Sequence, residues 1–332
     1  MPSNSWTPER FEQVADYLAD RLVLESAALD IYGQLADGPL GALEVADRLR
    51  LEPGATQLFL DALAALDLLV KDGRKYSNSE AADRYLVPSS PEYLGHRLIV
   101  AQQNWELWSR LPTGLRTGKR QRERRLFLDE PEATRHLLLS MHARARSRAA
   151  DILGRGLIDL QGCRQMLDLG GGAGTYSIAF CRAYKDLRVT LVDRPVAAAV
   201  ARDAVASAGL EDRISILEYD VDERELPSDY DFIWMSNVIH SRSYNANRAL
   251  LERLFNRLQS GGKIAIQDII MDETRTRPAR GAVFSLHMLL NNGVGRCYTF
   301  QDIHTWLAGA GYSEVRWIRD DDEDQTIVRA TK

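Results

Sequence analysis

The stretch MLDLGGGAG, residues 166–174, decides the fold. Its first four residues, together with Gln165, read as a strand, and a helical pattern begins at Thr175. The glycines between them permit a tight turn and let a ligand approach the backbone at the carboxyl end of the strand. Counted from Gly170, the sixth position is Thr175, whereas the dinucleotide-binding fingerprint needs Gly or Ala there. The spacing therefore argues against a dinucleotide cofactor.

Strands and helices alternate along the chain from this stretch onward, as they do in a parallel sheet with crossover helices. The expected strands are residues 165–169, 188–192, 214–217, 231–236, 262–268, 313–318 and 325–330, and the expected helices are 175–184, 196–208, 246–258 and 300–310. Only the acidic run 320–324 separates the last two strands, which is too short for a crossover, so they form an antiparallel hairpin. We expect an α/β, doubly wound, Rossmann-like domain of seven strands, and we interpret the acidic run as a solvated turn.

The N-terminal segment, residues 11–86, reads as three helices followed by a hairpin at Asp72–Gly73, which is the pattern of a winged helix. Spacing places Leu22, Ala28, Ile31 and Leu35 on one helix face. The third helix, residues 55–68, is apolar on most sides and contains no Lys or Arg. Binding to DNA depends on such cations, so we expect this helix to be buried in a subunit interface instead.

Composition restricts the class of protein further. The chain has 332 residues, 45% of them hydrophobic and 27% charged, with a net charge of -5, which is typical of a soluble globular protein without attraction to nucleic acid or anionic lipid. Its apolar runs are far shorter than the ~20 residues that span a membrane. No secretory signal is evident, so we expect a cytoplasmic protein without a membrane partner. The three cysteines form no CxxC pair, and we expect no metal site.

Three acidic residues follow three successive strands. Asp168 ends the first, Asp193 ends the second where a carboxylate can accept both hydroxyls of a ribose, and Asp220 follows the third where it can meet an adenine amino group, with Val221 beside it to pack on the ring. Asp168, two residues before glycines at the alternating positions 170, 172 and 174, resembles the first motif of class I S-adenosylmethionine (SAM) methyltransferases, and the acids after the next two strands support the same interpretation. We therefore expect SAM as cofactor and S-adenosylhomocysteine (SAH) as product, with contacts from Asp168, Gly170, Gly172, Gly174, Asp193, Asp220, Val221 and Ser236.

Two further polar residues are expected at the same edge of the sheet. His240 follows the fourth strand, where an imidazole suits the removal of a proton from a hydroxyl group at neutral pH. Asp268 ends the next strand and can fix the tautomer of that imidazole, or it can simply cap the loop that follows. The candidate catalytic residues are therefore His240 and Asp268.

A family resemblance covers nearly the whole chain. Its segments are residues 22–86, DLGGGAG (168–174), LVD (191–193), YDV (219–221), SNVIH (236–240), LQSGGKIAIQD (258–268) and GRCYTFQDIHTWLAGAGY (295–312). They resemble the small-molecule O-methyltransferases with an N-terminal winged-helix dimerisation domain, which include plant caffeic acid and acetylserotonin enzymes and bacterial natural-product enzymes. The resemblance implies that His240 is the catalytic base, that Asp268 flanks it, and that a second flanking Glu is replaced near Cys297.

The expected organisation follows from these segments. We assign residues 1–95 to a dimerisation domain, 96–160 to a helical linker and substrate lid, and 161–332 to the SAM-binding domain. The acceptor is expected between the helical middle segment and the sheet edge. Candidate contacts are Trp105, Met141, His142, His287, Met288 and Asn291, an aromatic and Met-containing set that suits a flat phenolic ligand.

These observations predict a homodimeric SAM-dependent O-methyltransferase that acts on a hydroxyl group of an aromatic small molecule. Methylation of carbon or nitrogen on the same scaffold is the nearest alternative, with His240 only orienting the acceptor. A DNA-binding regulator that keeps the SAM fold is a less favoured one.

Overall fold

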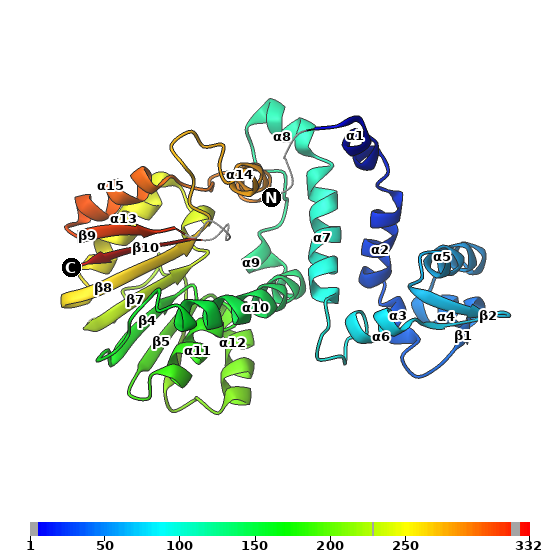
Figure 1. Cartoon of the computed structure of the whole chain (residues 1–332), viewed down its shortest axis with the longest axis horizontal. Coiled ribbons are helices and arrows are strands. Elements are labelled where there is room, and N and C mark those ends of the chain that lie inside the picture. Colours follow the sequence, from blue (N-terminus) through cyan, green and yellow to red (C-terminus); the bar gives the residue numbers. More distant parts are fainter. Residues whose placement is uncertain (1–5, 228, 320–325) are drawn as a thin grey trace. The chain divides into compact units, whose positions relative to one another are not determined.

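The computed structural model describes residues 6–227, 229–319 and 326–332. The chain divides into two compact units, Met1–Glu106 and Leu107–Lys332, each of which is described by itself (Figure 1). Within the described ranges, no helix combines the length and the apolar character that crossing a membrane requires.

The first unit contains helices around a small antiparallel sheet. Its elements are α1 (Pro8–Ala15), α2 (Leu18–Ala28), α3 (Ile31–Gln34), β1 (Leu40–Gly41), α4 (Ala42–Leu49), α5 (Pro53–Ala65), β2 (Leu69–Asp72), β3 (Lys75–Asn78), α6 (Glu80–Tyr85) and most of α7 (Gly95–Trp108). The strand order is β1-β3-β2, and Asp72 pairs with Lys75 across the turn, which confirms the predicted hairpin.

Two details of this unit differ from the sequence prediction. Leu22, Ala28, Ile31 and Leu35 do not share one helix, because α2 ends at Ala28 and the left-handed backbone of Asp30 (φ 55°) separates it from α3. The third helix also differs in its bounds, since α5 covers Pro53–Ala65 rather than residues 55–68. Leu60 and Leu63 are fully buried, whereas Leu58 is 74% exposed, so α5 keeps an apolar face that this single chain does not cover.

The second unit is built on a seven-stranded sheet. The strands are β4 (Gln165–Leu169), β5 (Arg188–Asp193), β6 (Ile214–Glu218), β7 (Tyr230–Ser236), β8 (Leu258–Asp268), β9 (Ser313–Ile318) and β10 (Thr326–Thr331), in the order β6-β5-β4-β7-β8-β10-β9. The five strands β6, β5, β4, β7 and β8 pair in parallel, each with the next in this order. Strand β10 pairs antiparallel with both β8 and β9, which confirms the doubly wound sheet and its terminal hairpin. The acidic run 320–324, predicted as a solvated turn, lies outside the described residues.

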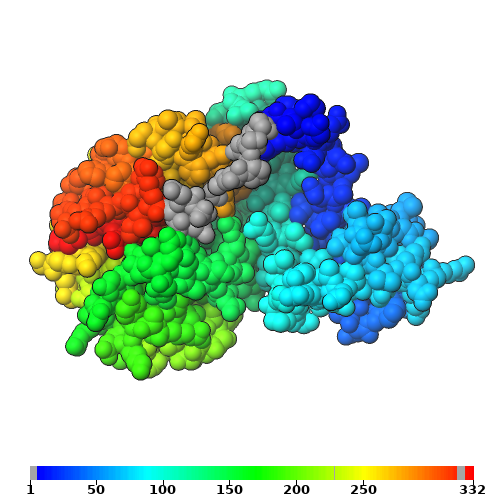
Figure 2. Space-filling model, in the orientation of Figure 1, coloured from blue at the N-terminus to red at the C-terminus, as the bar shows by residue number. Residues whose placement is uncertain are grey.

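Helices cover both faces of this sheet. The remaining elements are α8 (Leu111–Thr117), α9 (Leu126–Asp129), α10 (Pro131–Gly154), α11 (Thr175–Ala183), α12 (Pro195–Ala208), the short 3-10 turn η1 (Ile239–Ser241), α13 (Tyr244–Phe255), α14 (Ala279–Asn291) and α15 (Phe300–Ala310). One buried cluster joins α10, α11 and α12 to one face of the sheet. A second cluster joins α13 and α15 to the other face, while the edge strand β9 reaches the surface seen in Figure 2.

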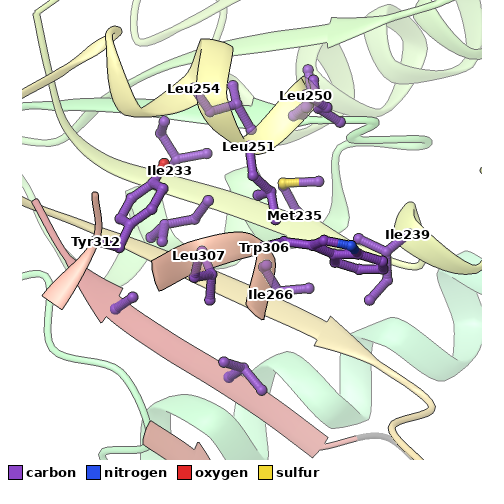
Figure 3. Close-up of a cluster of buried hydrophobic side chains, with 14 of the residues drawn as sticks. Ile233, Met235, Ile239, Leu250, Leu251, Leu254, Ile266, Trp306, Leu307 and Tyr312 are labelled. Carbon is purple, nitrogen blue, oxygen red and sulfur yellow. The ribbon is translucent and has the colours of Figure 1, made fainter. Parts of the chain in front are cut away.

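Trp306 is central to the second cluster. It is fully buried between α13 and the sheet, near Leu251, Met235 and Ile266 (Figure 3). The rings of Tyr244 and Tyr298 meet it edge-on, with ring centroids 4.9 and 4.7 Å away. This packing anchors α13 and α15, so the loops that connect them to the sheet are fixed at its carboxyl edge.

The strand order places a topological switch point between β4 and β7. The chain runs from β4 outward to β5 and β6, and then returns to β7 on the other side of β4. Such a reversal leaves the carboxyl ends of β4 and β7 without a crossover between them, and open α/β sheets bind ligands at this point.

Candidate active site

The glycine turn after β4 is built from a backbone that other residues tolerate poorly. Gly170, Gly172 and Gly174 all have positive φ, at 69°, 56° and 73°. A Cβ atom at Gly170 would lie 2.7 Å from a side-chain carbon of Val238, which follows β7. Glycine is therefore needed here both for the left-handed backbone and for the close approach of the two strand ends.

Asp193 is bound to this glycine turn. Its Oδ2 accepts from the backbone N–H of Gly172 at 2.8 Å, and its Oδ1 accepts from that of Arg194 at 2.7 Å. Burial raises the pKa of Asp193, although both backbone hydrogen bonds oppose the shift. Each carboxylate oxygen retains a second lone pair, so Asp193 can still accept from hydroxyl groups of a ligand.

Asp220 lies beside Arg194. The guanidinium donates to Asp220 Oδ2 from Nε at 3.0 Å and from Nη2 at 2.6 Å. Burial would raise the pKa of Asp220, but hydrogen bonds from the backbone of Asp222 and from Arg194 outweigh it and hold that pKa below its ordinary value. Asp220 is therefore an ionised acceptor, and Val221 next to it packs against the core cluster of the second unit.

Asp168 contacts α11 rather than open space. It is 1% exposed, and its Oδ2 accepts from the hydroxyl of Ser177 at 2.5 Å. Burial raises the pKa of Asp168 to about 7, with a further contribution from the charge of Asp193. The residue thus connects the glycine turn to α11. Ser236, at the end of β7, accepts from the side-chain amide of Asn237 at 3.0 Å.

His240 and Asp268 form a close pair at the ends of neighbouring strands. Nδ1 of His240 lies 2.7 Å from Oδ1 of Asp268, which also accepts from the backbone N–H of Ile269 at 2.8 Å. A carboxylate only accepts hydrogen bonds, so Nδ1 donates the proton and Nε2 remains the basic nitrogen. The Asp268 side chain is 1% exposed and that of His240 is 12% exposed, so the imidazole is largely shielded from solvent but still accessible.

The turn η1 that carries His240 is fixed from three directions. The carbonyl of Ile239 accepts from Asn247 Nδ2 at 2.9 Å, and the carbonyl of Ser241 accepts from Asn292 Nδ2 at 2.8 Å. The carbonyl of Arg242, which follows the turn, accepts from the hydroxyl of Tyr298 at 2.7 Å. The backbone of Gly295 also packs on this turn, because a Cβ atom there would lie 2.1 Å from the carbonyl oxygen of His240. The segment 292–298 therefore holds the backbone of the turn that carries His240.

The candidate acceptor-contact residues separate into two groups. Trp105 belongs to the first unit, and its described ring contacts are with Tyr17 and Arg21. In the second unit, Phe284 lies edge-on to His240 with ring centroids 5.0 Å apart, and it stacks on His287 at 5.4 Å. The rings of Phe284 and His287 thus extend the candidate site from His240 along α14.

The remaining candidate acceptor contacts have no described contact with His240. His142 Nδ1 lies 2.7 Å from the hydroxyl of Thr175, which ties α10 to the start of α11. Met288 is buried, Met141 is 37% exposed, and Asn291 is half-buried at the end of α14. Sequence reasoning did not find Ser177, Asn292 or Gly295, because nothing in their local pattern signals a partner far away in the chain.

Comparison with known proteins identifies the family. A model of the O-methyltransferase domain matches residues 127–313, and a model of the O-methyltransferase dimerisation domain matches residues 14–88. The chain is 33% identical over 298 residues to the 3-hydroxy-5-methyl-1-naphthoate 3-O-methyltransferase of Streptomyces sahachiroi, covering 87% of this chain and 84% of the relative. The chain belongs to the O-methyltransferase family.

Two further similarities are informative. This O-methyltransferase is 31% identical over 277 residues to the N,N-dimethyltransferase OxyT of Streptomyces rimosus, with 81% of this chain and 78% of the relative covered. The fold matches the human N-acetylserotonin methyltransferase, solved in complex with SAM, at a TM-score of 0.79 and 24% identity over 100% of this chain and 99% of that chain. The O-methyltransferase is a SAM-dependent enzyme, and its N-terminal unit carries the dimerisation domain.

The first prediction concerns Asp168. Its pKa of about 7 exceeds the ordinary value of ~3.9, so between these pH values the folded chain keeps a proton that the unfolded chain has lost. The free energy of unfolding should therefore fall as pH rises from ~4 to ~7 and level off above. Asp168→Asn should flatten this slope when urea unfolding is measured without SAM. The exposed Asp203→Asn should leave the slope unchanged, and equal slopes for all three proteins would contradict the assignment.

The second prediction concerns Gly295. Gly295→Ala places a methyl group against the carbonyl of His240 and should shift η1, which should lower turnover roughly 100-fold, as expected for a catalytic group displaced by ~1 Å. SAM affinity, measured by calorimetry, should stay within about 2-fold because the glycine turn is untouched. Gly309→Ala is the matched control, since a Cβ atom there meets nothing within 4 Å. Full turnover in Gly295→Ala would show that this contact does not position the base.

Proposed function

We propose that this enzyme transfers the methyl group of SAM to a hydroxyl group on an aromatic small molecule, with His240 as general base. The pairing of His240 with Asp268 carries the proposal, because it leaves a basic Nε2 at the carboxyl edge of the sheet. The naphthoate 3-O-methyltransferase of Streptomyces sahachiroi supports the acceptor class, since its name specifies an aromatic hydroxyl group.

The residues at the glycine turn fit the cofactor. Positive φ at Gly170, Gly172 and Gly174 keeps side chains away from the turn, and ionised or hydrogen-bonded acids stand at the ends of β5 and β6. We infer that Asp193 accepts from the ribose hydroxyls and that Asp220 accepts from the adenine amino group, as the sequence predicted. When bound, SAM supplies an electrophilic methyl group on a sulfonium.

In the proposed mechanism, His240 Nε2 removes the proton of the acceptor hydroxyl. The oxygen would form its bond to the methyl carbon while the sulfur–methyl bond of the sulfonium breaks, so that the sulfur keeps the electron pair and SAH would be the neutral leaving group. The proton stays on the imidazole, and the adjacent carboxylate of Asp268 stabilises the imidazolium cation that results. The buried position of Asp268 strengthens this interaction, since water screens it little. The second flanking acid that the family resemblance implies is absent at Cys297, where burial, and next the charge of Asp268, raises the pKa of the thiol to about 12. Within the part of the chain that the structure describes, the proposed base therefore has one carboxylate partner, Asp268.

Methylation at nitrogen is the alternative that an observation supports, because the relative OxyT is named as an N,N-dimethyltransferase. The two reactions differ in their need for a base. A neutral amine already has a free lone pair, whereas a neutral phenol with a pKa near 10 is a weak nucleophile at pH 7. A turnover that depends on His240 therefore distinguishes methylation of a hydroxyl group from methylation of an amine.

The test compares the parent enzyme with His240→Ala in a screen of aromatic acceptors with methyl-labelled SAM. The variant should bind SAM normally and lose roughly 10²- to 10⁴-fold in turnover, and the acidic limb of the parent's pH–rate profile should disappear with the imidazole. His304→Ala, a histidine on α15, is the control. Locating the label on nitrogen or carbon, or finding near-parent turnover in His240→Ala, would refute the proposal.

The dimerisation domain supports a homodimer formed through the N-terminal unit. We propose that the exposed apolar side chains of this unit form part of that interface, and that nucleic acids and membranes are not partners. Such side chains include Trp6, Phe11, Tyr17, Leu18, Leu43, Leu58, Leu66 and Val70. The boundaries at residues 95 and 160 and the cytoplasmic location stay predictions from the sequence.

A charge placed on that surface tests the interface. Leu58→Glu should shift the molar mass measured by light scattering from dimer toward monomer, because an unpaired carboxylate is costly to bury between subunits. Leu115→Glu, a similarly exposed leucine on α8, should leave the mass unchanged. A dimer of undiminished stability in Leu58→Glu would place the interface elsewhere.

A further inference from the structure

His287 on α14 has its tautomer set by a neighbouring tryptophan. The indole Nε1–H of Trp108 donates to Nδ1 of His287 at 3.2 Å. An indole nitrogen is only a donor, so Nδ1 must be the unprotonated nitrogen that accepts. The neutral ring then carries its single hydrogen on Nε2, and His287 presents a hydrogen-bond donor there.

The imidazole of His287 also stays uncharged over the working pH range. Burial, followed by the positive charge of Arg122 and the nearby His240, lowers the pKa of His287 to about 4. A second general base in the same site would have to take up a proton near neutral pH, and His287 does not. Its remaining chemical function is to donate a hydrogen bond from Nε2.

The position of this donor is defined by a row of rings. His287 lies nearly parallel to Trp108, which donates to its ring edge (centroids 6.4 Å apart, 12° between planes), and to Phe284 (5.4 Å, 20°). Phe284 in turn meets His240 edge-on. Among the residues that the structure describes, no group hydrogen bonds to Nε2 of His287, and its side chain is only partly buried. A donor without a protein partner therefore lies one aromatic ring away from the catalytic base.

We propose that His287 selects the acceptor: its Nε2–H donates to an oxygen on the same ring system as the hydroxyl group that is methylated. The preferred acceptors are then hydroxylated aromatics that also carry a carbonyl-type oxygen. An acceptor that covers the partly buried imidazole but lacks this oxygen leaves the donor unpaired, and unpaired buried donors are a strong source of discrimination between similar ligands. This inference rests on the proposed function, since it assumes an aromatic acceptor beside His240.

The test measures binding rather than turnover. The SAH-loaded enzyme is titrated by calorimetry with methyl 3-hydroxy-2-naphthoate, which carries an ester carbonyl, and with 2-naphthol, which lacks it. The parent should bind the ester about 10-fold or more tightly than the naphthol. His287→Phe, which keeps an aromatic ring but removes the donor, should abolish most of that preference. His287→Gln, which restores an N–H near Nε2, should recover part of it.

Comparing the ratio of the two affinities across the variants cancels the difference in size between the ligands. SAH affinity should be unchanged in every variant, which confirms that the fold and the cofactor site are intact. A parent that shows no preference, through equal binding or through failure to bind the ester, overturns the proposal. So does a preference that His287→Phe retains.

A second measurement tests the tautomer directly. Nitrogen-15 NMR of the parent should show His287 protonated at Nε2 and unprotonated at Nδ1, and Trp108→Phe should give a mixture of the two tautomers with a reduced preference for the ester. A hydrogen on Nδ1 in the parent overturns the argument. Because neither readout involves methyl transfer, methylation at nitrogen would refute the proposed function while these results still decide the role of His287.

Discussion

The hydrogen bond between His240 and Asp268 depends on the register of two parallel strands. β7 and β8 are neighbours, with Ser236 opposite Gln267, so the residues that follow them emerge together at one edge of the sheet. A shift of either strand by one residue would turn its side chains to the opposite face and separate the pair. The buried packing around Trp306 and Leu251, which joins α13 and α15 to these strands, therefore also maintains the chemistry at their ends.

The backbone organises the part of the site that we propose binds the cofactor. The carboxylate of Asp193 is held by the N–H groups of Gly172 and Arg194, and the glycine turn is connected to α11 through Asp168 and Ser177. These bonds form within the chain itself, so little ordering remains for a ligand to impose. The ion pair between Arg194 and Asp220 adds a charge-dependent element, because it holds the Asp220 carboxylate ionised and oriented.

Sequence patterns predicted the strand and helix order because periodicity and turn residues are local signals. The helix 300–310 and the strand 313–318 match α15 and β9 residue for residue. The break at Asp30 was missed, since a left-handed backbone at a residue other than glycine has no clear signature. The contacts of Asn292 and Gly295 with η1 were missed for another reason: they join segments more than 50 residues apart, and only packing brings these together. The proximity of His240 and Asp268 could be inferred, because the carboxyl ends of parallel strands share one edge of a sheet.

Segment 292–298 and helix α14 differ in what a substitution there affects, because the former donates a hydrogen bond to the backbone of η1. Segment 292–298 holds the turn of the proposed base through backbone carbonyls and through a position without a Cβ atom, so we expect substitutions there to act on the reaction itself. The preceding turns of α14 present side chains, such as Phe284 and His287, whose replacement alters ring stacking and hydrogen bonding without touching that backbone. If these residues act as proposed, variation in α14 gives new acceptor preferences while the turn that carries His240 is inherited intact, and this helix is the place to begin when redirecting the enzyme to other aromatic compounds.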